Sequence, residues 1–211
     1  MAEPVVHGPA FSTYVRSVRL ALHEKGVPHQ LVEVDILGGA HKQSPHIERH
    51  PFGKVPAFEH DGNRFYEASA ILRYIDEVFP GPALMPSTPI ARAKANQVMS
   101  IVDSYGYTPC VTNTFIPRGL VPSLGGQTDM EKVEAAKQPA VLFVTELDRE
   151  LGSNQFFGGA NVCLADLHVL PVVTYFAATP EGKGALEGTP NLRAWLSRMQ
   201  KRPSVQAMMP S

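Results

Sequence analysis

The fold is decided by the stretch His50–Phe58, which reads HPFGKVPAF, together with the stretch Phe65–Ile71, which reads FYEASAI. In the first stretch a proline and a glycine predict a turn before Val55, and Pro56 then opens a short apolar run typical of a strand start or an edge strand. In the second stretch Glu67 stands where a strand ends and a helix begins. Together the two stretches predict a site for a small peptide.

The backbone of these stretches suits such a ligand. If the Val55–Pro56 bond is cis, the N–H and C=O of Val55 turn outward and can pair with the backbone of an extended peptide. The first N–H groups of the helix that follows Glu67 would hold a ligand carboxylate at the same place. Glu67 itself would take a ligand ammonium.

These residues, with Ser12 and Thr13 upstream, resemble the glutathione-binding half of the cytosolic glutathione S-transferases, and the resemblance extends over almost the whole chain. It is closest to the serine-type, phi-like branch, in a bacterial or fungal style. The pattern of that branch is a strand, a glycine, three residues, a serine and then a helix, which corresponds here to Val5–Ser12 running on into a helix. His41 and Lys42 resemble the His-Lys pair of the same family.

The periodicity of the first part of the chain predicts alternating strands and helices. Short apolar runs at Val5–Val6 and Leu31–Ile36 flank a helical pattern, which is a β-α-β opening. A hairpin is predicted over Pro56–Tyr66, because its turn contains Asp-Gly and Gly-Asn. A helix from about Glu67 to Phe79 follows, and this order is that of a thioredoxin-like domain.

Prolines and glycines crowd the segment 81–90, which is therefore the predicted linker between a domain at 1–80 and a domain at 91–211. Apolar residues repeat at helical spacing from Val133 to Leu151 and again from Leu164 to Thr174, so the second domain is expected to be all helical. The segment Pro117–Thr128 is expected to separate two long helices. The predicted fold class is an α/β thioredoxin-like N-terminal domain plus an all-α C-terminal domain, the glutathione transferase fold.

A buried helix start is predicted at Cys163. The family has a Ser or Thr cap at this place, followed three residues later by Asp, and here Cys163 takes the cap position while Asp166 follows it. A thiol accepts a hydrogen bond less well than a hydroxyl does, so the capping box is expected to be weakened, although Asp166 still reaches back to the backbone. Both residues are interpreted as structural.

Composition limits the classes of partner. The chain has 211 residues, of which 44% are hydrophobic and 18% charged, and these proportions suit a compact protein with a sizeable core. The net charge of -1, with Lys and Arg scattered among Asp and Glu, predicts neither nucleic acid nor an anionic membrane as partner. Cys110 and Cys163 lie far apart, which favours a reducing, cytoplasmic location. No leader pattern and no long apolar run is seen, so neither export nor a membrane span is expected.

Ser12 is the predicted catalytic residue. A free thiol has a pKa of about 8.5, so an enzyme that uses glutathione must favour the thiolate. Ser12 stands where the first strand ends and the first helix begins, so its hydroxyl and nearby N–H groups can point at one sulfur. The alternative is that Ser12 or Thr13 merely caps the helix. A tyrosine mechanism is disfavoured because Tyr14 is already inside the helix, and a cysteine mechanism because no cysteine lies near the first strand.

The resemblance implies a set of contacts to the tripeptide. The glycine carboxylate would meet a basic pair, the cysteinyl part would pair with the backbone before a proline, and the γ-glutamyl end would meet a glutamate and the helix after it. The residues in these roles are Ser12, His41, Lys42, Lys54, Val55, Pro56, Glu67 and Ala68. Ala68 departs from the pattern, because relatives have Ser there, and the loss of one hydroxyl bond is expected to weaken glutathione binding.

The helical domain is expected to contribute the pocket for the second substrate. Phe11, Tyr105 and Phe115 are the candidates, with burial in the core as the alternative for each aromatic ring. His46 and His50 are four residues apart, but no acidic residue or cysteine joins them at ligand spacing, so no metal site is predicted.

The predicted function is a glutathione transferase that conjugates the glutathione thiolate to a small hydrophobic electrophile. No metal or redox cofactor is implied, since glutathione is a co-substrate. Family members are commonly homodimers, and Phe52 is where some insert an aromatic side chain into the partner. The alternatives are a glutathione-dependent isomerase or peroxidase, and a non-catalytic ligand-binding protein of the same fold.

Overall fold

The computed structural model describes residues 2–208. Contacts divide these residues into two compact units. The first unit takes the chain up to Met85 together with the residues from Pro203 onward, and the second is Pro86–Arg202. The point of division lies inside the predicted linker 81–90. The domain limits 1–80 and 91–211 stay a prediction.

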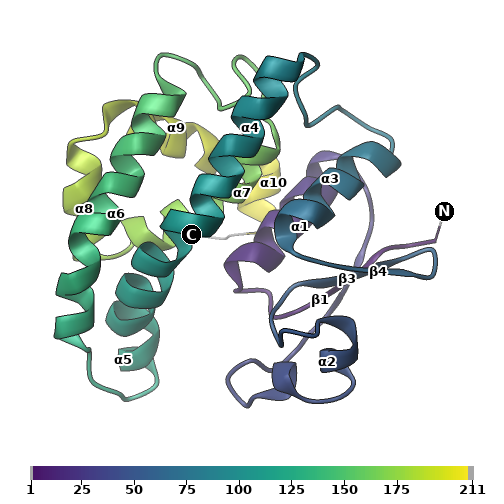
Figure 1. Cartoon of the computed structure of the whole chain (residues 1–211), viewed down its shortest axis with the longest axis horizontal. Helices are drawn as coiled ribbons and strands as arrows, with labels where there is room; N and C mark the ends of the chain where they lie inside the picture. The colour runs from purple at the N-terminus through teal and green to yellow at the C-terminus, as the bar shows by residue number, and fades with distance from the viewer. Residues whose placement is uncertain (1, 209–211) are drawn as a thin grey trace. The chain divides into compact units, whose positions relative to one another are not determined.

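The first unit contains a four-stranded sheet with the order β2-β1-β3-β4, in which β1 and β2 are parallel and the other pairs antiparallel. Helices α1 and α3 cover one face of this sheet, and the short α2 lies on the other (Figure 1). The elements of the unit are β1 (Val5–His7), α1 (Thr13–Glu24), β2 (Gln30–Val32), η1 (Ala40–Lys42, a 3₁₀ turn), α2 (His46–Arg49), β3 (Ala57–His60), β4 (Asn63–Tyr66), α3 (Ala68–Val78) and α10 (Pro203–Met208). This architecture confirms the thioredoxin-like prediction.

Strand β2 is shorter than the run Leu31–Ile36 predicted. Within residues 2–208 it is an edge strand that pairs with β1 alone, and the pairing stops at the partners His7 and Val32. Beyond that point Gly8 turns the first strand away with a φ of 148°. A strand at an edge ends where its neighbour ends, so the alternation of residues 33–36 produced no further pairing.

The two faces of the sheet differ in chemistry because successive residues of a strand point to opposite sides. Phe58 and Phe65 are cross-strand partners, and their rings lie 6.1 Å and 4.2 Å from the ring of Tyr74 in α3. The next pair along the strands points the other way, where the ring of Tyr66 lies 5.1 Å from that of His50, next to α2. The apolar core of the unit therefore lies between the sheet and helices α1 and α3.

A buried lysine joins the end of α1 to α3 and to the segment after α3. The Nζ of Lys25 donates to Asp76 Oδ1 at 3.1 Å, to the Asp76 carbonyl at 2.9 Å and to the Pro82 carbonyl at 3.3 Å. The Asp76 carboxylate in turn accepts the backbone N–H groups of Leu84 and Met85. Because both charges are paired and hydrogen-bonded, their burial is tolerated.

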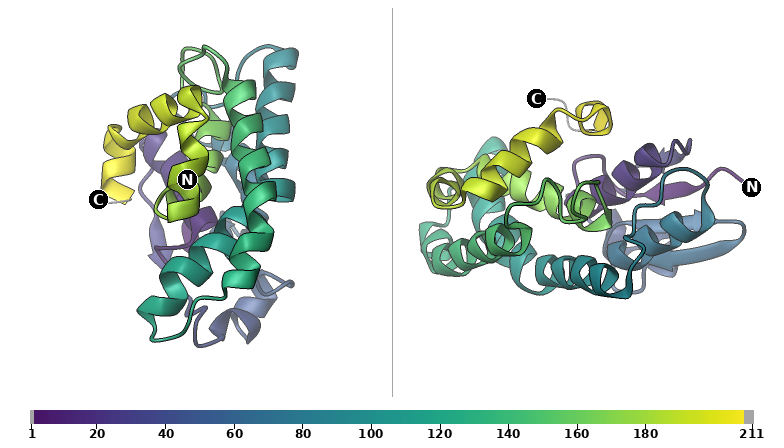
Figure 2. Two further views of the ribbon diagram at one scale, coloured as in Figure 1. Left: turned by 90° about the vertical axis from the view of Figure 1, so that its left-hand side faces the viewer. Right: turned by 90° about the horizontal axis from the view of Figure 1, so that it is seen from above.

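The second unit is helical, as predicted, and among its described residues only two isolated β-bridges occur, at Phe156–Gly159 and Gly158–Asn161. Figure 2 shows its long helices from two further sides. Its elements are α4 (Pro89–Ile101), η2 (Val102–Gly106, a π-helix), η3 (Thr108–Leu120, a π-helix), α5 (Val121–Ser123), α6 (Met130–Leu151), α7 (Leu164–Ala177), α8 (Pro180–Glu187) and α9 (Pro190–Gln200). The apolar positions predicted between Val133 and Leu151 are buried along α6.

The prediction of a break over Pro117–Thr128 was wrong about the end of the helix, because it placed that end too early. Pro117 lies inside η3, and helical structure continues to Ser123. A proline removes one donor from a helix, and the wider π-turn of η3 changes which carbonyl loses its partner. The actual break follows at residues 124–129, where Gly125 has a φ of 82° and Asp129 then caps α6.

Helix α7 starts at the predicted place, with Cys163 as its N-cap. Asp166 is fully buried, and its Oδ2 accepts the N–H of Cys163 at 2.8 Å. Its Oδ1 accepts the N–H of Phe157 at 3.0 Å and the indole N–H of Trp195 at 2.7 Å. One carboxylate thus ties the start of α7 to the preceding loop and to α9.

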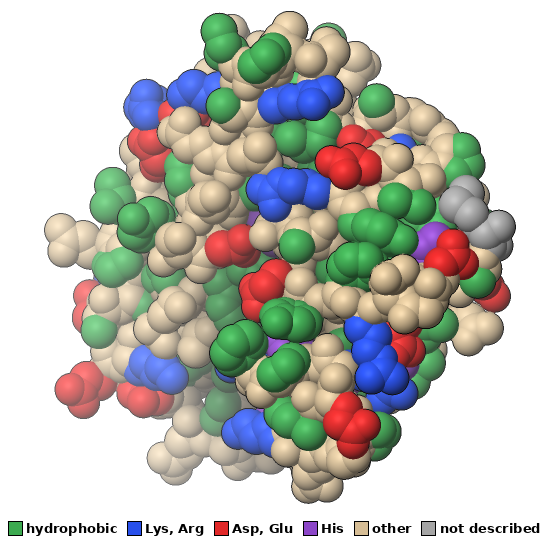
Figure 3. Space-filling model, turned by 45° about the vertical axis from the view of Figure 1, so that its right-hand side comes forward, with side chains coloured by type: hydrophobic (Ala, Val, Ile, Leu, Met, Phe, Trp, Pro, Cys, Tyr) green, Lys and Arg blue, Asp and Glu red, His purple; other side chains and the backbone are tan. Residues whose placement is uncertain are grey.

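On the face of the molecule drawn in Figure 3, acidic and basic side chains are interspersed, and no extended patch of one sign is seen there.

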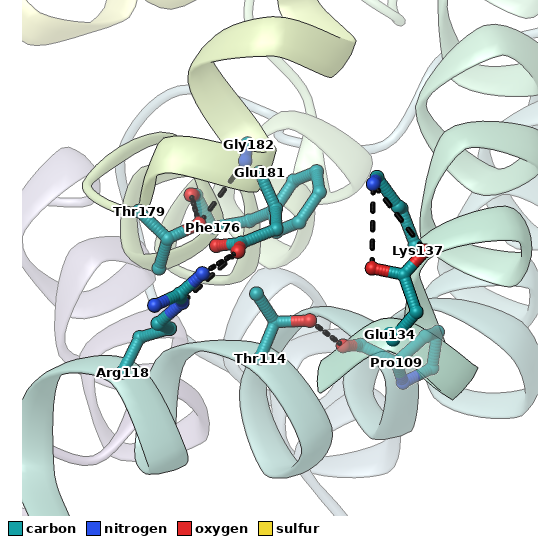
Figure 4. Close-up of polar contacts among 9 residues, drawn as sticks. All are labelled: Pro109, Thr114, Arg118, Glu134, Lys137, Phe176, Thr179, Glu181 and Gly182. Carbon is teal, nitrogen blue, oxygen red and sulfur yellow. Dashed lines mark hydrogen bonds and ion pairs between the residues drawn. The ribbon is translucent and has the colours of Figure 1, made fainter. Parts of the chain in front are cut away.

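The start of α8 is joined to η3 by an ion pair, which Figure 4 shows in close-up together with the cap of α8. In Figure 4, Arg118 Nε donates to Glu181 Oε1 at 2.9 Å, and Thr179 Oγ1 accepts the N–H of Gly182 at 3.0 Å. These contacts fix α8 within the second unit.

None of the helices among residues 2–208 is long and apolar enough to cross a membrane.

Candidate functional site

The register of the sheet brings the predicted site segments to one edge of the first unit. His7, Ala57 and Tyr66 are cross-strand partners in one row. The loop to Ser12 leaves the sheet directly after His7, Val55 and Pro56 enter directly before Ala57, and Glu67 follows directly after Tyr66. Three segments that are far apart in the sequence therefore meet at the same end of the sheet.

Ser12 precedes α1 in an extended conformation, with φ -64° and ψ 133°. Although it occupies the N-cap position, its side chain makes no capping hydrogen bond. Ser12 is half-buried and lies next to the end of a helix whose first N–H groups lack intrahelical partners. The simple capping role weighed for Ser12 therefore finds no support in its hydrogen bonding.

The loop that carries Ser12 is held by two side chains that bond to one residue. Glu33 Oε1 accepts the N–H of Ala10 at 3.1 Å, and Arg16 Nε donates to the carbonyl of Ala10 at 3.1 Å. Glu33 was not predicted at all, because its role depends on where β2 ends relative to the loop, and no local pattern reveals that.

The Val55–Pro56 bond is cis. Within residues 2–208, neither the N–H nor the C=O of Val55 takes part in a hydrogen bond. Val55 also touches the Ser12 loop, since a Cβ added to Gly8 would lie 3.0 Å from Val55 Cβ and 2.5 Å from Val15 Cγ2. Gly8 thus lets the loop that carries Ser12 and the segment that carries Val55 approach closely.

We expect Gly8→Ala to impair both stability and glutathione binding. At a φ of 148° with a clash against buried Val15, the new methyl group would lower the free energy of unfolding by about 1–3 kcal/mol and displace Val55. Urea denaturation and glutathione titration measure the two effects. Gly26→Ala is the matched control, because its φ is also positive, at 69°, but nothing lies within 4 Å of the added Cβ. Equal losses in the two variants would show that backbone strain alone matters.

Glu67 has a φ of 69°, a conformation that non-glycine residues rarely adopt and that costs about 1–3 kcal/mol. It precedes α3 and is exposed, and its side chain makes no capping bond. In the described part of the chain, the N–H groups of Ala68 and Ser69 donate no hydrogen bond. An exposed carboxylate and two available N–H groups therefore stand together where an amino-acid end of a ligand could bind.

His41 and Lys42 form the turn η1, and Gly53 packs against them, since a Cβ there would lie 3.2 Å from the His41 carbonyl and 3.4 Å from Lys42 Cγ. Lys42 and Lys54 are exposed. Partial burial, and then the positive charges of Lys42 and other neighbours including Lys54, lower the pKa of His41. The predicted basic residues are thus brought together, and their mutual repulsion adds to burial in disfavouring the charged form of His41.

His7, at the end of β1, is held by a carboxylate of the neighbouring strand β3. Its Nε2 lies 3.0 Å from Glu59 Oε2, and Arg49 and Arg64 bond to the other carboxylate oxygen of Glu59. Burial lowers the pKa of His7 despite this carboxylate partner. Tyr14 lies within α1, as predicted.

The residues predicted for the second-substrate pocket differ in surroundings. Phe11, in the first unit, is exposed, and Tyr105, in η2 of the second unit, is 68% exposed. Phe115 is half-buried and stacks flat on Tyr175, with 4.1 Å between ring centroids and 2° between planes. The assignment of Phe11, Tyr105 and Phe115 to one pocket stays a prediction.

The histidines and cysteines show no metal-binding arrangement. The rings of His46 and His50 stack at 6.4 Å, and across residues 2–208 no group of three or more His, Cys, Asp or Glu side chains is placed to hold a metal ion. Cys110 and Cys163 are free and buried, and burial raises the pKa of both thiols well above the usual range. Neither is a reactive nucleophile.

Family comparisons agree with this fold. Residues 6–83 match the family model of the glutathione S-transferase N-terminal domain, and residues 108–203 match that of the glutathione S-transferase C-terminal domain. The chain belongs to the glutathione S-transferase family.

Individual relatives match over nearly their whole length. Glutathione S-transferase F6 of Arabidopsis thaliana is 33% identical over 212 residues, covering 99% of this chain and all of the relative. Among solved structures, glutathione S-transferase III in apo form has a TM-score of 0.87 at 27% identity and covers 100% of this chain and 97% of its own. Glutathione S-transferase-I bound with the ligand lactoylglutathione has a TM-score of 0.84 at 26% identity, with 98% of each chain covered.

Proposed function

We propose that the protein is a glutathione transferase that adds the glutathione thiolate to a small hydrophobic electrophile, with Ser12 as the residue that stabilises the thiolate. The observation that carries this proposal is the Ser12 hydroxyl, which makes no capping bond and stands at the end of the sheet where Val55 and Glu67 also lie. Glutathione is a co-substrate, and the reaction needs no other cofactor. The relatives named above carry the same activity in their names.

The chemical task is to lower the pKa of the glutathione thiol. A shift of two units needs about 2.7 kcal/mol of preference for the anion, at 1.36 kcal/mol per unit. A hydroxyl donor and the positive end of α1 act on the same atom and together supply energies of that size. The thiolate then attacks the electrophile, forming the carbon–sulfur bond by addition or with loss of a leaving group from the electrophile.

The remaining residues of the site hold the tripeptide. The backbone of Val55, before Pro56, pairs with the cysteinyl part, which is the pairing mode of strand addition. Glu67 takes the γ-glutamyl ammonium and the N–H of Ala68 its carboxylate, with the N–H of Ser69 beside it. The basic residues His41, Lys42 and Lys54 serve the glycine end.

The branch of the family, the domain division and the cellular location of the protein are part of the same proposal. We assign the chain to the serine-type, phi-like branch on Ser12, whereas the Arabidopsis thaliana relative named above is a plant protein and gives no support to a bacterial or fungal style. Residues 1–80 are the proposed glutathione-holding domain, and residues 91–211 are the proposed source of the electrophile pocket, with Tyr105 and Phe115 as its candidate lining residues. The free, buried cysteines support a cytoplasmic location.

The proposal is tested by glutathione calorimetry on the purified protein, combined with the ultraviolet absorbance of bound thiolate against pH. Binding with a thiol pKa well below about 8.5 supports it. Turnover with an activated aryl chloride separates the transferase from an isomerase or peroxidase using the same thiolate. A protein that binds glutathione but never ionises its thiol is a non-catalytic binding protein, and the proposal then fails.

Glutathione binding is expected to take up a proton at His41. In the free protein the pKa of His41 is lowered by partial burial and by neighbouring positive charges. A carboxylate bound beside it favours the imidazolium, so the pKa rises in the complex, and affinity is full at low pH and declines as pH rises through the pKa of the complex. Calorimetry with S-methylglutathione, which has no thiol to ionise, in buffers of different ionisation enthalpy measures the uptake. His41→Gln should abolish it, and an unchanged uptake in that variant contradicts the role.

We further propose a homodimer in which Phe52 enters the partner. Phe52 is 71% exposed, and its ring is held by Tyr66 at 6.1 Å and by His50 at 6.3 Å. A large aromatic side chain that is exposed yet fixed is typical of an interface anchor. Phe52→Ala is expected to weaken the dimer at least about 10-fold in sedimentation experiments. Leu37→Ala, an exposed apolar residue in the same unit, is the control. A monomeric wild-type protein would refute the assignment.

A further inference from the structure

His46 makes a short hydrogen bond that the proposed mechanism leaves unused. Its side chain is buried, with the residue only 4% exposed, and its Nε2 lies 2.7 Å from the carbonyl oxygen of Lys54. A carbonyl can only accept, so Nε2 carries a proton. His46 therefore acts as a donor to this carbonyl in both its neutral and its protonated form.

The local fold brings these two residues together across eight positions of sequence. His46 opens the four-residue helix α2, whose end is marked by the bond from the N–H of His50 to the carbonyl of His46 at 2.9 Å. The N–H of Gly53 then bonds to the carbonyl of His50 at 2.8 Å, and Gly53 has a φ of 58°. This turn reverses the chain, so the Lys54 carbonyl faces the imidazole of His46.

The imidazole of His46 is also fixed in orientation. Its ring stacks on that of His50 with 6.4 Å between centroids and 26° between planes. The ring of His50 in turn packs against Tyr66 at 5.1 Å, and Tyr66 belongs to β4. The donor is thus held in place by rings that reach back to the sheet, which limits its freedom to move.

The bond acts on a single peptide plane. The C=O of Lys54 and the N–H of Val55 belong to the same peptide group, which is planar, so holding the carbonyl also sets the direction of the N–H. Because that carbonyl points to His46, the N–H of the trans peptide points to the opposite side. Within the described chain the N–H of Val55 has no hydrogen-bond partner of its own. Its direction is therefore decided by the carbonyl's bond and not by a bond of its own.

We propose that His46 is a positioning residue for glutathione, which fixes the Lys54–Val55 peptide plane so that the N–H of Val55 is aimed at the ligand backbone. This inference rests on the proposed function, in which Val55 pairs with glutathione. His46 touches neither substrate. It lowers the cost of binding because the Val55 donor is oriented before the ligand arrives.

Two variants separate the donor from the ring. His46→Phe keeps an aromatic ring against His50 but removes the donor, and His46→Gln keeps an N–H donor but removes the ring. We expect His46→Phe to raise the glutathione Kd and KM about 5- to 20-fold, as expected for a buried carbonyl left without its partner. The kcat at saturating glutathione and the KM for the aryl chloride should change less than about 2-fold, because the thiolate-stabilising residues are intact. His46→Gln should recover most of the affinity.

The outcomes distinguish this inference from the proposed function. If wild type binds glutathione, Ser12→Ala raises the thiol pKa and His46→Phe binds as wild type does, only the role of His46 is refuted. A parallel fall of kcat, both affinities and melting temperature would also refute it, because that result describes a merely structural residue. If wild type fails to bind glutathione, the proposed function falls and this inference with it.

A measurement on the wild-type protein tests the proposal even if the variants fail to fold. In a long-range nitrogen–proton correlation spectrum, His46 should show a proton on Nε2 that exchanges slowly with water. Adding S-methylglutathione should shift the Val55 amide signal and leave the Nε2 proton in place. Loss of that proton on binding, or a Val55 amide that does not respond, overturns the proposal.

Discussion

Replacement of Ser12 by alanine should lower kcat/KM near neutral pH by about 100-fold or more, the loss measured when one preorganised donor to a developing anion is removed. The physical reason is that the hydroxyl donates to the sulfur only when the sulfur is charged, so its loss raises the thiol pKa and leaves the neutral ligand nearly as well bound. Absorbance of the thiolate against pH and glutathione calorimetry measure the two effects. Activity should recover partly as pH rises, because solvent then ionises the thiol that the enzyme no longer ionises.

Matched variants keep this prediction specific. Thr13, the next hydroxyl, is buried at the start of α1, and Thr13→Ala should leave the thiol pKa unchanged. Stability should change by less than about 0.5 kcal/mol in Ser12→Ala, because Ser12 makes no capping bond to lose. A stability loss near 1 kcal/mol with an unchanged thiol pKa would show that Ser12 is a helix cap after all.

Replacement of Asp166 by alanine is the change expected to damage the fold most. Its carboxylate is fully buried and accepts the N–H groups of Cys163, Phe157 and Trp195. Each donor left without a partner in the interior costs about 1–3 kcal/mol, so the sum approaches the whole stability of an ordinary domain. We expect little folded protein, and urea denaturation followed by circular dichroism measures what remains.

Two comparisons test that explanation. Asp129 is an exposed N-cap whose side chain accepts one hydrogen bond, from the N–H of Lys132 at 3.0 Å. Asp129→Ala should therefore lower the free energy of unfolding by only about 1 kcal/mol. Cys163→Ser offers α7 a better acceptor at the same N-cap and should raise stability by about 0.5–1 kcal/mol. If Asp166→Ala and Asp129→Ala were equally mild, the buried network would contribute far less than its hydrogen bonds indicate.

Much of the fold could be predicted because local sequence and final structure agree. The helical spacing from Val133 to Leu151 became the buried stripe of α6, and the Asp-Gly hairpin before Glu67 became β3 and β4. Cys163 and Asp166 took their predicted places at the start of α7. These signals are short-range, and the tertiary packing reinforces them.

The features that the sequence did not reveal depend on neighbours far along the chain. The early end of β2 depends on where Gly8 turns β1 away, and the passage of η3 through Pro117 depends on the π-helical turns around it. For the site, the residue types at Ser12, Val55 and Glu67 were readable from a family pattern. Their supports, Glu33 at the Ala10 N–H and His46 at the Lys54 carbonyl, were not, because each acts through one contact that only the folded chain creates.

Lys25, which is buried beneath the end of α3, limits where the chain can be divided into fragments. A fragment ending at Phe79, where the last helix of the thioredoxin-like unit stops, would lose the Pro82 carbonyl that Lys25 binds and the backbone N–H groups that Asp76 binds. Dissection, circular permutation or grafting of a different helical half should therefore cut after Met85. The same reasoning predicts that insertions between Phe79 and Met85 will be poorly tolerated, although the segment looks from its prolines like an ordinary flexible spacer.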